Sequence, residues 1–150
     1  MSAGSKKRKG MRARVFYARA VPSTLPDALA LVDDILHTLQ AHGWIYSENE
    51  CKIRLCLEEA LVNAVRHGNR DNPSQTVEVR LLESPECCKI QVRDEGKSLS
   101  VRRTTVPSPE QMGGRGLCLI RHYTQKVRYD KARGILEMIF TKPSIVRNSS

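Results

Sequence analysis

Three polar side chains recur at four-residue intervals in the segment "EEALVNAVRHGNRD", which spans residues 58–71. They are Glu59, Asn63 and His67, and this spacing places them along one edge of a helix. Mg²⁺ accepts amide oxygens and often takes only one or two ligands from the protein, leaving the rest to water and phosphates. A carboxylate one turn earlier can orient or deprotonate a hydroxyl. The row therefore predicts a site for a nucleotide and Mg²⁺, although such a pair on a helix is more often solvated surface.

A second polar segment, Asp94, Glu95 and Gly96, follows an apolar strand pattern. A carboxylate at this position can accept a hydrogen bond from the exocyclic amino group of adenine. The glycine allows the backbone to pass close to a flat ring. Taken alone, the tripeptide is more typical of an ordinary turn at the end of a strand.

A third segment, "GGRGL" at residues 113–117, precedes a short apolar stretch. Backbone amides at the start of a helix bind phosphate, and glycines allow the phosphate to come close. Arg115 can add a cation for a terminal phosphate. A flexible connector with a glycine turn is the alternative for this segment alone.

Two helices are predicted ahead of these segments. In residues 22–44, Ser23 or Thr24 can cap the helix, Pro26 suits its first turn and Gly43 ends it. The expected apolar stripe of this helix is Leu29, Val32, Ile35, Leu36 and Leu39. Residues 47–68 predict the second helix, with Ser47 and Glu50 as a capping box and Gly68 as the stop. The expected buried face of the second helix is Ile53, Leu57, Ala60, Leu61 and Ala64.

The remaining elements are strands and one further helix. Strand patterns cover residues 12–21, Thr76–Glu83, 87–96, 125–130 and 135–142, and a helix is expected after residue 113. Residues 97–112 are polar and basic, which is typical of a loop. Short connections between consecutive strands indicate antiparallel pairing. The order predicts an α/β two-layer sandwich, with a mixed, mainly antiparallel sheet and helices on one face.

Composition limits the class of protein. The chain has 150 residues, of which 40% are apolar, enough for one domain with a core. No apolar run reaches the roughly 20 residues of a membrane span, and no secretory signal is recognisable. The five cysteines match no zinc-binding spacing and are interpreted as reduced thiols of a cytosolic protein.

The net charge of +9 is concentrated at the N-terminus. Six of these charges come from Lys6, Lys7, Arg8, Lys9, Arg12 and Arg14. We expect residues 1–11 to be a disordered, solvated tail rather than an arm that binds nucleic acid or an acidic partner. Residues 144–150 are expected to be disordered as well, leaving one domain over residues 12–143.

The three segments together resemble a known family. "EEALVNAVRHGN", "VRDEGKSL" and "GGRGLCLI" are similar to the N box and the two glycine boxes of the GHKL ATPase superfamily. The small single-domain branch of bacterial anti-sigma-factor serine kinases is the most similar one, over roughly residues 14–142. The resemblance implies the Bergerat ATP-binding fold, with ATP or ADP and Mg²⁺ as ligands.

The resemblance also assigns roles to residues. It implies that Asn63 binds Mg²⁺, that Glu59 is the catalytic base, and that Asp94 binds adenine beside Gly96. Gly114, Arg115, Gly116 and Leu117 would form the phosphate loop, and residues 97–112 the lid. His67 is expected to cap or pack the helix end rather than bind a ligand.

The function implied is that of an anti-sigma factor in a bacterial cytoplasm. Such a protein sequesters a sigma factor and phosphorylates a serine of a STAS-domain anti-anti-sigma factor, in the mechanism called partner switching, and it is commonly a homodimer. The alternative is a catalytically weak or inactive, nucleotide-gated binding module. Ser98, at the usual place of the second glycine of the first glycine box, and the short lid favour this alternative.

Overall fold

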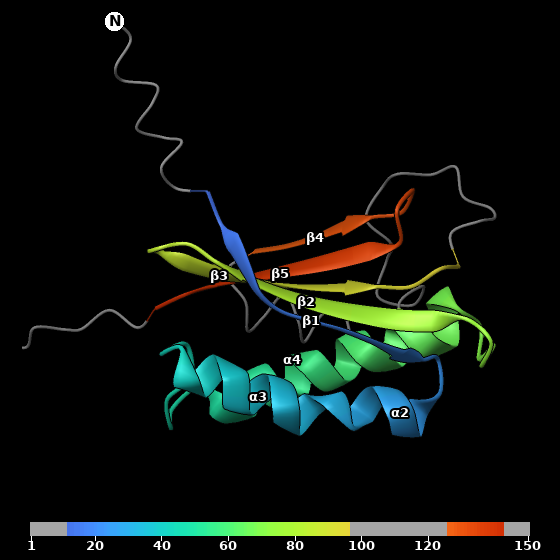
Figure 1. The fold of residues 1–150 in the computed structure, drawn as a ribbon, viewed down its shortest axis with the longest axis horizontal. Helices are drawn as coiled ribbons and strands as arrows, with labels where there is room; N and C mark the ends of the chain where they lie inside the picture. Colours follow the sequence, from blue (N-terminus) through green and yellow to red (C-terminus); the bar gives the residue numbers. More distant parts are fainter. Residues whose placement is uncertain (1–11, 97–125, 143–150) are drawn as a thin grey trace, which may run out of the picture.

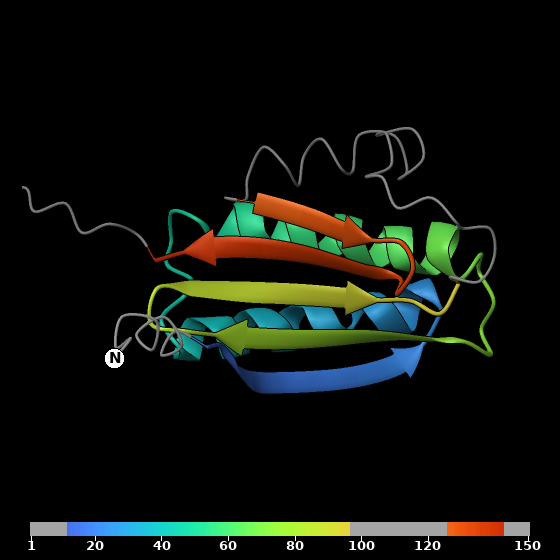
Figure 2. The same cartoon turned by 90° about the horizontal axis from the view of Figure 1, so that it is seen from above.

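The described part of the chain has two layers, a β-sheet and a group of helices packed on one of its faces (Figure 1). It is a computed structural model and describes residues 12–96 and 126–142. Figure 2 shows the strands side by side with the helices beneath them. The predicted two-layer α/β sandwich with helices on one face is confirmed.

Five strands form the sheet in the order β1-β2-β3-β5-β4, and every neighbouring pair is antiparallel. Their bounds are β1 Arg14–Pro22, β2 Thr76–Glu83, β3 Cys87–Arg93, β4 Lys126–Asp130 and β5 Ile135–Thr141. Alternation sets their faces: Val77, Val79 and Leu81 are fully buried against the helices, while the residues between them point to the other face. The expected hairpin between β2 and β3 is confirmed.

The first predicted helix is present but divided into α2, Leu25–Leu29, and α3, Leu31–Ala41. Thr24 is the N-cap, and its hydroxyl accepts a hydrogen bond of 3.1 Å from the Asp27 amide. At the far end, Gly43 has a φ of 81°, and the amide of Trp44 donates to the Leu39 carbonyl. This is a Schellman ending, so the expected start and stop are both confirmed.

One expectation for this helix is wrong. Leu29 was expected in the buried stripe, but it is 37% exposed. It is the last residue of α2, next to the turn at Ala30 and at the margin of the apolar face. Ala28 and Leu31 point inward in its place.

The second helix, α4, runs over Glu50–Asn63, and its expected buried face is confirmed. The predicted capping box is wrong, because the N-cap is Asn49 and no side chain caps the helix. Ser47 lies in the preceding turn, where its hydroxyl donates to Glu48. The Asn49 carboxamide oxygen accepts from the Tyr46 amide, so it satisfies the turn instead of the helix.

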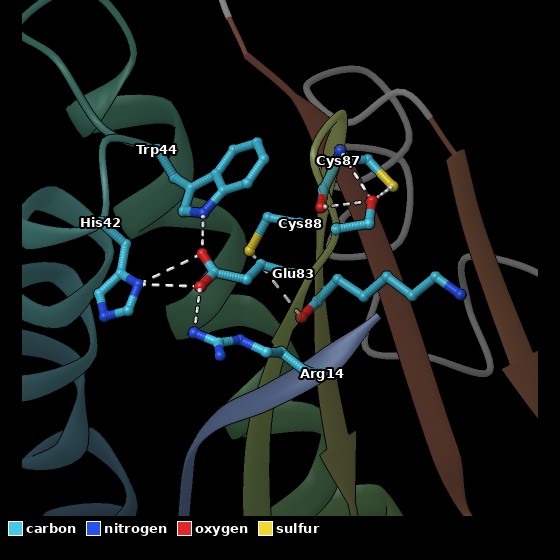
Figure 3. A network of polar contacts seen from close by, with 8 residues as sticks. Arg14, His42, Trp44, Glu83, Cys87 and Cys88 are labelled. Atoms are coloured by element: carbon cyan, nitrogen blue, oxygen red, sulfur yellow. Dashed lines mark hydrogen bonds and ion pairs between the residues drawn. The ribbon is translucent and has the colours of Figure 1, made fainter. Parts of the chain in front are cut away.

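At one end of the molecule, Glu83 joins β2 to the end of α3 (Figure 3). Its carboxylate accepts a 2.8 Å hydrogen bond from the Trp44 indole and a 3.1 Å contact from His42 Nδ1. Arg14, opposite Glu83 in the sheet, forms an ion pair with it at 3.7 Å. This network stabilises the end of the sheet where β2 ends, opposite the end at Thr76 where β2 begins.

Candidate functional site

A pocket opens between the end of α4 and the sheet, at the end where β2 begins. It is a partly enclosed hollow that is open to solvent on one side. Its lining is an apolar floor with a few polar side chains: Ala60, Asn63, Ala64, His67, Gly68, Val92, Asp94, Tyr129, Lys131 and Leu136. Segments far apart in the sequence, from α4, β3 and the β4–β5 hairpin, therefore meet here.

Asn63 is the last residue of α4 and is 5% exposed. Its Nδ2 atom is buried and has no hydrogen-bond partner among the described residues. A buried polar atom without a partner costs roughly 1–3 kcal/mol, so such groups in folded proteins call for an explanation. A ligand in the pocket would supply one. The oxygen and nitrogen of a carboxamide exchange places by rotation, so Asn63 can present either to that ligand.

The helix changes character directly after Asn63. Residues Ala64–Gly68 form a π-turn, η1, in which the Asn69 amide donates to the Ala64 carbonyl at 2.8 Å. Single π-turns within α-helices are frequent at functional sites. The turn carries His67 and Gly68 into the pocket wall. His67 is exposed there, which does not fit the packing role expected for it.

Asp94 follows β3 and is 7% exposed. Its amide donates to the Gly134 carbonyl at 2.9 Å, and its Oδ1 accepts from the Gly96 amide at 3.0 Å. The carboxylate lies directly against Gly68, where an added Cβ would overlap it. An added Cβ at Gly96 would likewise overlap the Gly68 carbonyl. The pocket therefore depends on close backbone approach at Gly68 and Gly96.

The reason why position 68 requires a glycine therefore differs from the predicted one. The helix does end at Gly68, as expected. However, the positive φ angles after this helix belong to Arg70, at 49°, and Asp71, at 59°, and not to Gly68. Gly68 is required because it lies against Asp94 and not because it reverses the chain.

Two residues that were not predicted from the sequence, Tyr129 and Lys131, also line the pocket, from β4 and the turn after it. Burial raises the pKa of Tyr129 to about 12, and the negative charges of Asp94 and Asp130 add to the effect. Tyr129 is thus a neutral hydroxyl near Asp94 at any physiological pH. Only its alternation with the polar residues of β4 could have indicated that it faces the helices.

Glu59, the predicted catalytic base, lies one turn before Asn63 on α4 and is half-buried. It is not among the residues that line the pocket. Burial raises the pKa of Cys56 to about 12, and the negative charge of Glu59 adds to this effect. The structure therefore brings Asn63 and Asp94 to one pocket, with Gly96 behind it, and leaves Glu59 beside it.

The predicted phosphate loop and lid lie outside the described residues. This applies to Gly114, Arg115, Gly116, Leu117, Ser98 and the whole of residues 97–112. Within residues 12–96 and 126–142, no cluster of three or more His, Cys, Asp or Glu side chains could hold a metal ion.

Residues 22–140 match the family described as the histidine kinase-like ATPase domain. No curated protein matches the chain. Because the match covers most of its length, the chain belongs to the histidine kinase-like ATPase domain family, part of the GHKL superfamily. Membership of an ATPase-domain family implies nucleotide binding, and this pocket is the candidate site for it.

Proposed function

We propose that this ATPase-domain protein is an anti-sigma factor with ATP-dependent serine kinase activity. It would sequester a sigma factor and phosphorylate a serine of a STAS-domain anti-anti-sigma protein. The observation that carries the proposal is the convergence of Asn63 and Asp94 on one pocket, where the buried Asn63 amide nitrogen lacks a partner in the part of the chain that the structure describes. The remaining support is the resemblance of the three motifs to that branch.

In this proposal the two ends of ATP are held by different residues. Asp94 accepts a hydrogen bond from the adenine amino group, while Val92 and Leu136 provide the apolar surface beside the ring. Asn63 holds Mg²⁺, which when bound neutralises charge on the phosphates. Gly114, Arg115, Gly116 and Leu117 are proposed to hold the phosphates through backbone amides and one guanidinium.

The proposed transfer is a displacement at the γ-phosphorus of ATP. The serine oxygen of the partner forms a bond to phosphorus, the bond to the bridging oxygen breaks, and ADP leaves. Glu59 accepts or orients the proton of the serine hydroxyl. Positioning and electrostatic stabilisation would supply most of the rate enhancement.

The proposed location is the bacterial cytoplasm, and the protein is proposed to act as a homodimer. No helix in the described part of the chain is long and apolar enough to cross a membrane. Cys56 and Cys88 are buried free thiols, as expected for a reducing compartment.

A second candidate is a nucleotide-gated binding module without phosphotransfer. It is favoured by the place of Glu59, which does not line the pocket. In that case ATP would control partner binding but would not be consumed.

Phosphotransfer distinguishes the two candidates. The protein would be incubated with γ-labelled ATP, Mg²⁺ and purified STAS-domain proteins, with Glu59→Gln as the variant. We expect labelled STAS protein with the wild type and a rate about 10²–10⁴-fold lower with the variant, whose ATP affinity stays the same. ATP binding without any transfer would support the binding module instead.

A further inference from the structure

Asn69 is almost completely buried, at 2% exposure, yet it does not line the pocket. It is the residue directly after η1. We infer that Asn69 is a positioning residue, which fixes the turn carrying Asp94 and thereby sets the selectivity of the site for adenine. The inference rests on the proposed nucleotide-binding role of Asp94.

The Asn69 side chain uses both ends of its carboxamide. The Nδ2 atom donates to the Ser23 hydroxyl at 3.0 Å and to the Thr76 carbonyl at 2.9 Å. The Oδ1 atom accepts from the Glu95 amide at 2.7 Å. One side chain thus joins the connection between β1 and α2, the start of β2, and the residue next to Asp94.

Glu95 closes this set of contacts into a ring. Its Oε2 atom accepts from both the amide and the hydroxyl of Thr76, each at 2.7 Å. Asn69, Thr76 and Glu95 are therefore linked each to the next by short hydrogen bonds. Because Asn69 and Ser23 are buried, water does not readily replace their mutual bond.

The ring constrains Asp94 from its C-terminal side. The Asp94 amide is already held by Gly134, and the Glu95 amide is held by Asn69. With both peptide groups fixed, the Asp94 carboxylate stays against Gly68 at the pocket wall. Only a carboxamide of this length offers a donor pair and an acceptor together, so alanine, serine or aspartate cannot replace it.

Selectivity between ATP and ITP tests the inference. ITP lacks the 6-amino group that Asp94 is proposed to bind, so the ratio of the two dissociation constants reports the position of this carboxylate. Titration calorimetry would measure both constants for the wild type and for Asn69→Ala, at a temperature where urea or thermal unfolding shows each variant to be folded. We expect the Kd for ITP divided by the Kd for ATP to fall at least about fivefold in Asn69→Ala, because ATP binding weakens while ITP binding changes little.

Two variants separate positioning from stability. Ser23→Ala removes one buried partner of Asn69 but keeps its bond to Glu95, so it should lower stability and leave the ratio unchanged. Asn72→Ala is the matched control in the same loop, since the Asn72 side chain bonds only to Ser74 among the described residues. An unchanged ratio in folded Asn69→Ala overturns the inference.

Failure to fold would not end the test. If Asn69→Ala is unfolded, both constants are measured for Asn69→Ser, whose hydroxyl is one bond shorter than the carboxamide and so loses the bond to the Glu95 amide; a lowered ratio there supports the inference and an unchanged ratio overturns it. The wild-type titration is the separate test of the proposed function. If the wild type binds neither ATP nor ITP, the nucleotide site itself is wrong, whatever the variants do.

Discussion

Each important residue of the site is defined by what lies against it. Asn63 is buried, and its amide nitrogen lacks a partner within residues 12–96 and 126–142, which is unfavourable for a buried polar group. Asp94 is buried too, but its amide donates to the Gly134 carbonyl and its carboxylate accepts from the Gly96 amide. The site thus pairs one group that a ligand would satisfy with one that the protein already holds in place.

Gly68 provides a prediction at this scale. A methyl group at Gly68 would overlap the Asp94 carboxylate, so Gly68→Ala should displace Asp94 and cost about 1–3 kcal/mol of unfolding free energy. ATP affinity should fall as well. Urea denaturation and ATP titration would measure the two effects.

Gly43→Ala is the matched control for that experiment. Gly43 has a φ of 81° and no atom within 4 Å of an added Cβ, so alanine there meets only backbone strain. It should cost about 1–2 kcal/mol and leave ATP binding unchanged. Equal ATP affinity in Gly68→Ala and the wild type would show that Asp94 is not held by close contact with Gly68.

Among the elements, the hairpin and the helices differ in how well the sequence predicts them. β2 and β3 alternate strictly and have one buried face, so a two-residue period was enough to place both strands. The start of α4 was misplaced because Asn49 and Ser47 have local hydrogen-bond partners that compete with a cap. The π-turn η1 was not foreseen, since its composition suits an α-helix equally well.

The contact between β2 and the end of α3 gives a second prediction. Glu83→Ala leaves the buried Trp44 indole N–H without its acceptor, which should cost on the order of 1–3 kcal/mol. Trp44 is the sole tryptophan of the chain, so its fluorescence can follow unfolding in urea. ATP binding should persist, because the pocket lies at the other end of the sheet. Glu86→Ala, which changes an exposed carboxylate of the same hairpin, should have little effect on either property.

The thiols of α4 and β3 provide a third prediction. Burial raises the pKa of Cys56 to about 12 and raises the pKa of Cys88 further. A raised pKa favours the protonated thiol in the folded state. The contribution of these thiols to the free energy of unfolding is therefore complete below the ordinary thiol pKa and is lost as the pH rises toward the pKa of the folded state.

Alkylation at pH 8 tests the burial and the raised pKa values of Cys56 and Cys88. Exposed Cys51 should react with iodoacetamide in the native protein, while Cys56 and Cys88 should react only after unfolding. Peptide mass spectrometry would follow the three sites. Native labelling of Cys56 as fast as Cys51 would contradict the burial of this side of α4.

At the scale of the whole molecule, the two ends of the sheet carry different chemistry. One end holds the pocket, and the other holds the Glu83 network with Arg14 and Trp44. Local patterns predicted Asn63 and Asp94 as candidates, because each stands at the end of a regular element. Asn69, Tyr129 and Lys131 could not be found this way, since their roles arise from contacts between distant segments.

The basic N-terminal segment supplies the prediction at this scale. Deleting residues 1–11 removes Lys6, Lys7, Arg8 and Lys9, four of the nine net positive charges. Because the pocket is formed by α4, β3, β4 and β5, ATP affinity should be unchanged. Any weak, salt-sensitive binding to nucleic acid should be lost. A marked loss of ATP affinity on deletion would show that the segment belongs to the site.

The most direct test of the nucleotide site is calorimetric titration of the protein with ATP, with and without Mg²⁺, for the wild type and Asn63→Ala. We expect Mg²⁺-dependent binding by the wild type and at least about tenfold weaker binding by the variant. The unfolding free energy of the ligand-free variant should stay close to that of the wild type, because a buried amide nitrogen without a partner is removed. Equal, Mg²⁺-independent affinities in both proteins, or no binding by the wild type, would contradict the assignment of this pocket to Mg²⁺ and ATP.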